Sequence, residues 1–312
     1  MSYENFLYDI ALRDDRLMIL TAENRAAIRN LPLKLGKRFI DTGITEQTMT
    51  GIAAGLALRG RIPVTHALAA FLTMRAFEFI RTDIGIPALP VKMVGGVAGF
   101  LSEANGPTHQ ALEDISIMRG IPNMNVFAPA DEEDMLIGLE TVLLSSQPCY
   151  IRYNNLKPAM QHDRSFRMGK AEMINDGDDI TIITYGMLLR QAYEAMIMLE
   201  TKGISVRLLN MRTLKPVDEE AIINAAHQTS MIVTLEDHFL TGGLYSIVGE
   251  VFLKHNIMNN VLPIAMENKW FKPALLDDVL KYENFTGMAI AEKIQQSYTE
   301  KNSEILSVRS LI

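Results

Sequence analysis

The 312-residue chain has one cysteine, Cys149, and it lacks a basic cluster, a long apolar run and a secretory leader. A single cysteine excludes a disulfide framework and a cysteine-based metal cluster. No apolar segment approaches the roughly 18 residues that a transmembrane helix requires, and the N-terminus lacks the basic start and apolar core of a signal peptide. The net charge of −7 gives no support to nucleic-acid binding. These absences predict a cytoplasmic protein with no membrane or nucleic-acid partner.

The common phosphate-binding loops are also missing. The glycine-rich stretch Gly95-Gly96-Val97-Ala98-Gly99 follows an expected strand. It does not match the G-x-G-x-x-G pattern, no acidic residue follows at the expected distance, and no Walker-type glycine-lysine loop occurs elsewhere. The sequence therefore contains no recognisable diphosphate cradle of its own.

What the sequence does contain is a long alternation of strand and helix patterns. Hydrophobic content of 48% and charged content of 21% are typical of a globular protein, and the length suits two domains. The alternation predicts an α/β fold with two doubly wound domains, each a mostly parallel sheet with helices on both faces. Turn and linker residues interrupt it, which predicts domains at residues 1–157 and 179–312 joined by a linker at 158–178.

The expected elements follow from hydrophobic periodicity. In the first domain, strands are expected at 17–22, 38–41, 62–67, 90–94, 125–128 and 149–153, and helices at 1–16, 46–59, 70–84, 109–119 and 131–145. In the second domain, strands are expected at 179–185, 205–210, 231–236 and 261–265, and helices at 188–201, 218–227, 242–254, 275–283 and 287–301.

The stretch Asp41-Thr42-Gly43-Ile44-Thr45-Glu46-Gln47 places the Glu46 carboxylate between the end of an expected strand and the start of an expected apolar helix. Ligands of open α/β sheets bind at this edge. A helix N-terminus also favours an acid for purely structural reasons, because its partial charge is positive. From these residues alone, Glu46 is either a structural acid or a functional one.

Other candidate residues carry similar alternatives. His109 follows the turn Gly106-Pro107-Thr108, where it could exchange protons near neutral pH or simply cap a helix. Arg152 ends a strand, and its planar fork suits a carboxylate or phosphate, but it could equally form a salt bridge between domains. Phe71 and Arg75 on the helix after the third strand are consistent with core and surface positions. The cluster Glu236-Asp237-His238 is typical of a strand end.

Taken together and in this order, five motifs resemble the transketolase family, and in particular the C-terminal half of a transketolase or 1-deoxyxylulose-phosphate synthase. The matching stretches are 41–47, 62–76, 106–110 followed by Ile121-Pro122-Asn123, Pro129-Ala130-Asp131, and 148–153. The second domain resembles the family's C-terminal domain at 180–186 and 235–243. The family's diphosphate- and magnesium-binding motif is missing.

The resemblance implies thiamine diphosphate as cofactor, with Mg²⁺ held mainly by a partner subunit and no metal ligand on this chain. It implies that Glu46 hydrogen-bonds the aminopyrimidine ring of the cofactor and thereby promotes loss of its C2 proton. Phe71 is expected to stack on that ring. The remaining cofactor-binding residues implied by the resemblance are Leu68, Met74 and Glu23.

The resemblance also implies a substrate site. His109 is expected to contact the substrate as a catalytic residue, and Arg152 to anchor its anionic end; Asn105 and Arg75 are the other expected substrate contacts. The sequence departs from the family at several positions. Ala67-Leu68 replaces Thr-Phe, Asn105 replaces an aspartate, Val97 replaces a histidine or arginine, and Ala27 replaces a possible phosphate-binding serine.

We therefore expect a thiamine-diphosphate-dependent transferase, active only with an N-terminal transketolase subunit in an α2β2 heterotetramer that includes self-association of this chain. It would transfer a two-carbon ketol unit from a ketose, phosphorylated or otherwise anionic, to an aldose. The alternatives are the β-subunit of a 2-oxo-acid dehydrogenase E1 component, an enzyme like 1-deoxyxylulose-phosphate synthase, and a degenerate, non-enzymatic scaffold subunit. The Pro107-Thr108-His109-Gln110 stretch favours transketolase over the E1 component.

Overall fold

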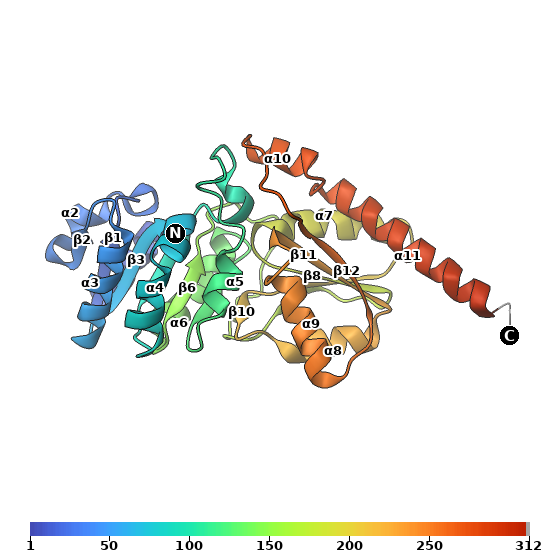
Figure 1. The fold of residues 1–312 in the computed structure, drawn as a ribbon, viewed down its shortest axis with the longest axis horizontal. Helices are drawn as coiled ribbons and strands as arrows, with labels where there is room; N and C mark the ends of the chain where they lie inside the picture. Colours follow the sequence, from blue (N-terminus) through green and yellow to red (C-terminus); the bar gives the residue numbers. More distant parts are fainter. Residues whose placement is uncertain (310–312) are drawn as a thin grey trace.

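The computed structural model describes the backbone of residues 1–309 and the side chains of residues 1–301. Two α/β units lie side by side (Figure 1), each built on its own sheet. The first sheet has seven strands in the order β10-β5-β6-β4-β3-β1-β2, and all its pairs are parallel except β10 with β5. Its strands are β1 (Leu17–Thr21), β2 (Phe39–Asp41), β3 (Ile62–Leu68), β4 (Lys92–Gly96), β5 (Asn125–Phe127), β6 (Cys149–Arg152) and β10 (Thr213–Lys215).

Helices cover both faces of the first sheet because alternate strand residues point to opposite sides. Leu17 and Ile19 pack in one cluster with α1 (Tyr3–Arg13), α2 (Leu31–Leu35) and α6 (Glu132–Leu144). Met18 and Leu20 pack in another with α3 (Glu46–Leu58), α5 (Asp114–Arg119) and the segment around α4 (Phe77–Phe79). The strands are buried on both sides, as parallel sheets require.

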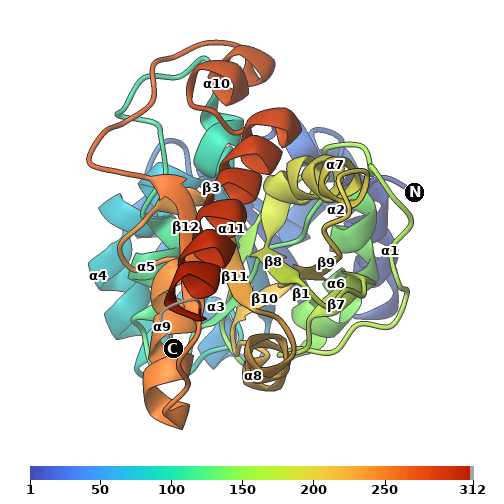
Figure 2. The same cartoon turned by 90° about the vertical axis from the view of Figure 1, so that its right-hand side faces the viewer.

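The second sheet has five strands in the order β12-β11-β8-β9-β7, with only β7 antiparallel. Figure 2 shows α7 and α8 on opposite sides of it, and α11 packs beside α7. The strands are β7 (Glu172–Asn175), β8 (Ile180–Thr184), β9 (Val206–Asn210), β11 (Met231–Phe239) and β12 (Asn260–Met266). The helices are α7 (Leu189–Glu200), α8 (Glu219–Gln228), α9 (Leu244–His255), α10 (Leu276–Tyr282) and α11 (Gly287–Arg309). The expected α/β class with two mostly parallel sheets is confirmed.

Several expected boundaries were wrong. The segment 158–178, expected as a linker, contains β7, and β10 from the second domain joins the first sheet. Both strands are short and antiparallel at sheet edges, so they lack the apolar run that marks a buried strand. The helix expected at 109–119 begins only at Asp114, so His109 lies in a turn before it. The helix expected at 70–84 contains two π-helical segments, Phe71–Arg75 and Ile80–Gly85.

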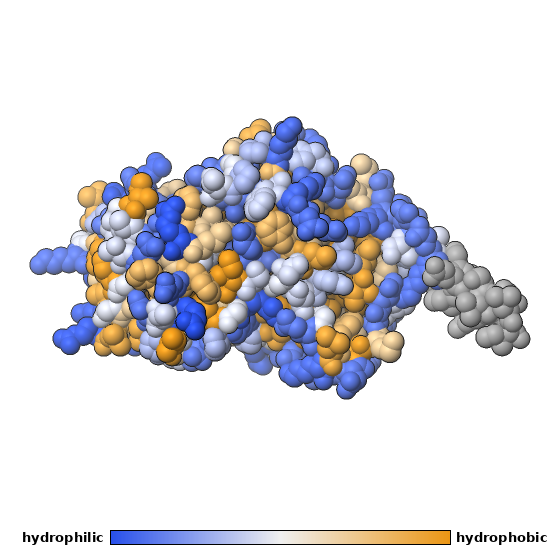
Figure 3. Space-filling view, viewed as in Figure 1, coloured by the Kyte–Doolittle hydropathy of each residue, from blue (hydrophilic) through white to orange (hydrophobic). Residues whose placement is uncertain are grey.

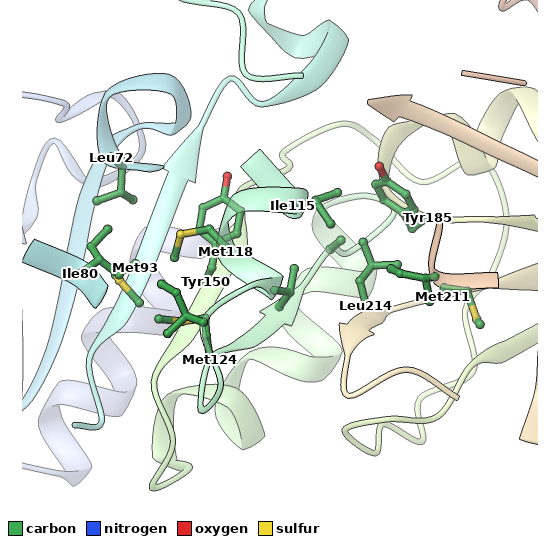
Figure 4. Packing of buried hydrophobic residues seen from close by; sticks show 14 of the residues in the cluster. Leu72, Ile80, Met93, Ile115, Met118, Met124, Tyr150, Tyr185, Met211 and Leu214 are labelled. Carbon is green, nitrogen blue, oxygen red and sulfur yellow. The ribbon is translucent and has the colours of Figure 1, made fainter. Parts of the chain in front are cut away.

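One apolar core runs from the first domain into the second. Figure 4 shows it continuing from Leu72 and Met93 through Tyr150 and Ile115 to Tyr185. The two domains therefore pack as one body, and the second domain covers part of the first sheet's edge. None of the helices in the described part of the chain is long and apolar enough to cross a membrane.

A buried network of charges ties the segment 158–178 to both sheets. His162 hydrogen-bonds Asp131 at 2.8 Å and Glu172 at 2.9 Å, and Arg212 pairs with Asp134 at 2.6 Å and with Glu172 at 3.0 Å. One atom each of Asp134, His162 and Glu172 lie within 4.8 Å of one another, which is close enough for a metal ion. Arg212 already neutralises these carboxylates, so the group is an ion-pair network.

This network makes the stability of the fold depend on His162. Burial alone lowers the pKa of His162, but the hydrogen bonds with Asp131 and Glu172 outweigh it and raise the pKa from its ordinary 6.5 to about 10. A raised pKa in the folded state gives stability that is complete below the unfolded value and is lost as the pH rises through the folded value.

We expect His162→Gln to lower the free energy of unfolding more at pH 6 than at pH 10. The difference between wild type and variant should shrink as the pH rises from about 6.5 towards 10, because the wild type loses the imidazolium that the variant never has. Urea unfolding followed by circular dichroism at a series of pH values measures it. A difference that is constant with pH would contradict this assignment.

Candidate active site

Glu46 forms the centre of a cluster at the edge of the first sheet where its parallel strands end. Thr45 occupies the N-cap position of α3 without a side-chain capping hydrogen bond, and Glu46 is the first helical residue. Its side chain is 3% exposed, and Arg75 Nη1 donates to its Oε2 at 3.0 Å. The pairing explains how a carboxylate can be buried here, because an unpaired buried charge is costly. The amide of Gln47 also donates to the Arg75 carbonyl, which joins α3 to the π-helical segment.

The same segment brings the expected aromatic and histidine residues together. The Arg75 guanidinium lies 4.3 Å from the centre of the Phe71 ring. The His109 ring meets that ring edge-on, with centroids 4.9 Å apart. Phe71 and Met74 pack on a floor of four alanines, Ala69, Ala70, Ala98 and Ala111. Glu46, Arg75, Phe71 and His109, which are distant in sequence, therefore form one contact chain.

The cluster fits one end of thiamine diphosphate. The Glu46 Oε1 oxygen has no hydrogen-bond partner among the described residues, so it is free for a ring nitrogen. Phe71 and Met74 are partly exposed, and they offer an apolar surface beside that oxygen. The residues that would hold the pyrimidine ring are thus Glu46, Phe71 and Met74, and Leu68 ends β3 three residues before Phe71. The chemistry that the cofactor supplies is stabilisation of a carbanion.

Arg152, expected to anchor an anionic substrate, forms a buried ion pair between the two domains. It is 5% exposed, and it donates to Asp114 at 2.8 Å and to Asp237 at 2.7 Å. Tyr150 also donates to Asp114, at 2.6 Å. Since Asp114 begins α5 and Asp237 lies in β11, Arg152 joins the two domains. The interdomain salt bridge, which the sequence left open, is the arrangement observed.

The other expected residues lie at varying distances from the cluster. Glu23 is exposed, and its described contact is a backbone hydrogen bond to Asp41, so the structure does not bring it to the Glu46–Arg75 pair. Asn105 is exposed on the loop before His109, and its amide donates to the Ser102 carbonyl. It is positioned near the mouth of the site rather than inside the contact chain.

Two features of the site escaped the sequence reasoning. Arg75 was expected to contact the substrate, but its ion pair with Glu46 was not predicted. The available signal in the sequence was that Arg75 follows Phe71 by four residues, a spacing that places the two side chains together. Gln110, buried behind His109, donates to the carbonyls of Asn105 and Phe271, and so fixes the loop against the second domain. No sequence pattern predicts the contact between Gln110 and Phe271, which lie 161 residues apart.

The glycine-rich turn is explained by close packing. Gly99 has φ +57, and a Cβ there would lie 1.8 Å from Asp237 Oδ2 and 2.8 Å from Arg152 Nη2. A side chain would therefore displace the interdomain ion pair. The turn brings backbone against the buried charges, and the Phe100 N–H donates to Asp237 at 3.3 Å.

Comparison with known proteins agrees with this architecture. The domain families described as "Transketolase, pyrimidine binding domain" and "Transketolase, C-terminal domain" match residues 3–158 and 169–290. The 6-deoxy-6-sulfo-D-fructose transketolase subunit of Clostridium sp. (strain MSTE9) is 37% identical over 254 residues, which are 80% of this chain and 79% of that protein. A putative transketolase C-terminal section of Methanocaldococcus jannaschii is 33% identical over 94% of each chain.

A solved structure gives the same result. A split-gene transketolase, described as an inactive beta4 tetramer, has a TM-score of 0.85 and 31% identity over 95% of this chain and 96% of that one. This chain belongs to the transketolase family. It corresponds to the C-terminal subunit of a split transketolase, and transketolases are transferases.

We expect Arg152→Met to lower the free energy of unfolding by about 3–5 kcal/mol, because it leaves two buried carboxylates without their cation. Urea unfolding of the full chain measures the change. Arg13→Met is the matched control, since Arg13 pairs with Glu140 at 2.7 Å on the exposed surface and such pairs contribute little. Equal unfolding midpoints for the two variants would refute the structural role of Arg152.

Proposed function

We propose that this chain supplies the pyrimidine-binding half of a thiamine-diphosphate-dependent transketolase that transfers a two-carbon ketol unit from a ketose to an aldose. The observation that carries the proposal is the buried Glu46 carboxylate with one free oxygen beside the exposed face of Phe71. The relatives support the class of reaction, since two are described as transketolase subunits for a sulfonated and a phosphorylated sugar.

In the proposed mechanism each residue of the cluster has a defined role. Glu46 holds a proton at a pyrimidine ring nitrogen through its free Oε1. Arg75 keeps the carboxylate in place, and it closes one side of Phe71. His109, beside the Phe71 ring, is placed to hydrogen-bond the oxygen atoms of the substrate and to move a proton. The alanine floor excludes water from this side of the reaction.

We expect Glu46→Gln to lower kcat for ketol transfer by roughly 10²–10⁴-fold in the assembled enzyme, the range for loss of a proton-transfer group. The amide preserves the shape and a hydrogen bond to Arg75, so the fold and the assembly should persist. Product formation from hydroxypyruvate and glyceraldehyde, followed with the co-expressed partner, measures the loss. Wild-type turnover in the variant would exclude Glu46 from the reaction.

The proposal requires a second polypeptide, because the diphosphate and Mg²⁺ must be held outside this chain. The surface supports a partner. Helix α3 is apolar from Gly51 to its end, yet Gly55 is exposed and Gly51 and Ile52 are only partly buried. The positions of Gly51 and Gly55, four residues apart, have open space where side chains would be. Figure 3 shows hydrophobic surface on the part of the first domain that carries α3 and α4.

We therefore propose an α2β2 assembly in which α3 packs against neighbouring subunits. The solved relative described as an inactive beta4 tetramer supports self-association of this chain without its partner, in an inactive form. The cytoplasmic location and the absence of nucleic-acid and membrane partners remain predictions from composition.

We expect Gly55→Leu to prevent assembly with the partner subunit while leaving this chain folded. The new side chain meets nothing in the isolated chain, and it improves helix propensity, but it removes the close approach that glycine permits. Size-exclusion chromatography with light scattering on the co-expressed pair measures assembly.

Gly249→Leu is the matched control. Gly249 lies inside α9, and its added Cβ would also meet nothing within 4 Å. This variant should assemble and react as wild type does. Full assembly of Gly55→Leu, or equal loss in both variants, would contradict the role of the α3 face.

A further inference from the structure

A cavity of about 350 Å³ opens at the edge of the first sheet where the parallel strands end. Open α/β sheets bind ligands at this edge. The ends of β1, β3, β4 and β6 contribute Asn24, Leu68, Val97 and Asn155, and the loop after β4 covers it with Glu103. Two of its lining residues are close in sequence to the residues around Phe71. Leu68 is three residues before Phe71, and Val97 precedes Ala98 in the alanine floor beneath that ring.

No cation faces this cavity from the described chain. Its lining includes no lysine or arginine, and its one carboxylate is Glu103. His66 also lines it, but both ring nitrogens are engaged, with the Tyr3 hydroxyl at 2.8 Å and the Leu20 carbonyl at 3.2 Å. Burial lowers the pKa of His66 to about 4, so the ring is neutral at pH 7. Arg152, the expected anchor, is held by two aspartates.

The polar groups that do face the cavity are neutral and unused. The side-chain amides of Asn24 and Asn155 and the hydroxyl of Tyr153 make no hydrogen bond within the described part of the chain. Amides and phenols both donate and accept hydrogen bonds, so they suit sugar hydroxyl groups. A phosphate dianion would meet the Glu103 carboxylate with no compensating charge, which is unfavourable in a partly enclosed site.

We propose that this cavity binds the uncharged, hydroxylated end of the acceptor aldose, so that the enzyme prefers unphosphorylated over phosphorylated acceptors. The inference rests on the proposed ketol transfer and adds to it the class of acceptor. It differs from the expectation from the sequence that Arg152 anchors an anionic end of the substrate. Asn155 and Glu103 are the residues on this chain that set the preference.

The test is a competition between two acceptors in the co-expressed complex. D-glyceraldehyde and D-glyceraldehyde 3-phosphate are supplied together with hydroxypyruvate, thiamine diphosphate and Mg²⁺, and the product ratio gives the ratio of kcat/KM values directly. We expect the unphosphorylated acceptor to be favoured by about tenfold or more, the factor that follows from roughly 1.4 kcal/mol of unpaired charge.

Variants show whether the cavity sets this ratio. Asn155→Arg should shift the ratio at least about tenfold towards the phosphorylated acceptor, because it supplies the missing cation. Asn155→Gln, the matched control, lengthens the side chain without charge, and it should keep the wild-type preference. Glu103→Gln should shift the ratio in the same direction as Asn155→Arg but by less, because it removes a negative charge without adding a cation. The amide oxygen of the glutamine can still accept from the Leu276 N–H, so the loop should keep its position.

Failure of this inference differs from failure of the proposed function. Activity that favours the phosphorylated acceptor, with a ratio unmoved by Asn155→Arg, would overturn the neutral cavity and assign the anion to cations of the partner subunit. No product from either acceptor, or from ketose donors, would instead overturn ketol transfer itself. A ratio near one in the wild type would also contradict the preference.

Discussion

The interaction on which the molecule depends is the buried pairing of Arg152 with Asp114 and Asp237. It ties the end of β6, the start of α5 and the strand β11 into one unit. Gly99 must lack a side chain for this pairing to form, because any Cβ would strike Asp237. The loop between β4 and α5, which carries Asn105 and His109, is thereby held against the second domain. The position of His109 thus depends on a buried charge cluster that His109 does not itself contact.

The same pairing limits what the site can bind. A guanidinium held by two carboxylates is not available to a substrate anion, and no other cation of the described chain lines the adjacent cavity. Meanwhile, Arg75 is committed to Glu46 and Phe71. Arg152, expected as the anion anchor, and Arg75, expected as a substrate contact, both form ion pairs within the protein. The chain provides a carboxylate, an aromatic surface and neutral polar groups.

Much of this fold could be predicted from sequence because the strands are buried on both faces and separated by turn residues. Such runs as Ile62–Leu68 and Cys149–Arg152 are apolar enough to be recognised without context. The strands β7 and β10 were missed because three or four residues at a sheet edge carry no such signal. The start of α5 was misplaced because Ala111 and Leu112 are buried outside a helix: Ala111 packs with the alanines beneath Phe71, and Leu112 packs in the core of the second domain.

For the site, too, part could be predicted from the sequence and part could not. Glu46, Phe71 and His109 were found from motifs, and the structure brings them into one contact chain. The role of Arg152 could not be settled from sequence, because a salt bridge and an anion anchor require the same residue at the same strand end. What decides between them is the presence of Asp237, which lies 85 residues away in sequence.

The central claim is that Glu46 activates thiamine diphosphate only when a second subunit holds the other end of the cofactor. Exchange of the cofactor C2 proton for deuterium, measured by rapid quench and NMR, tests it most directly. The account predicts fast exchange in the complex of wild-type subunits, and exchange at the rate of free cofactor with this chain alone or with the Glu46→Gln complex. Fast exchange with this chain alone, or undiminished exchange in the Glu46→Gln complex, would contradict it.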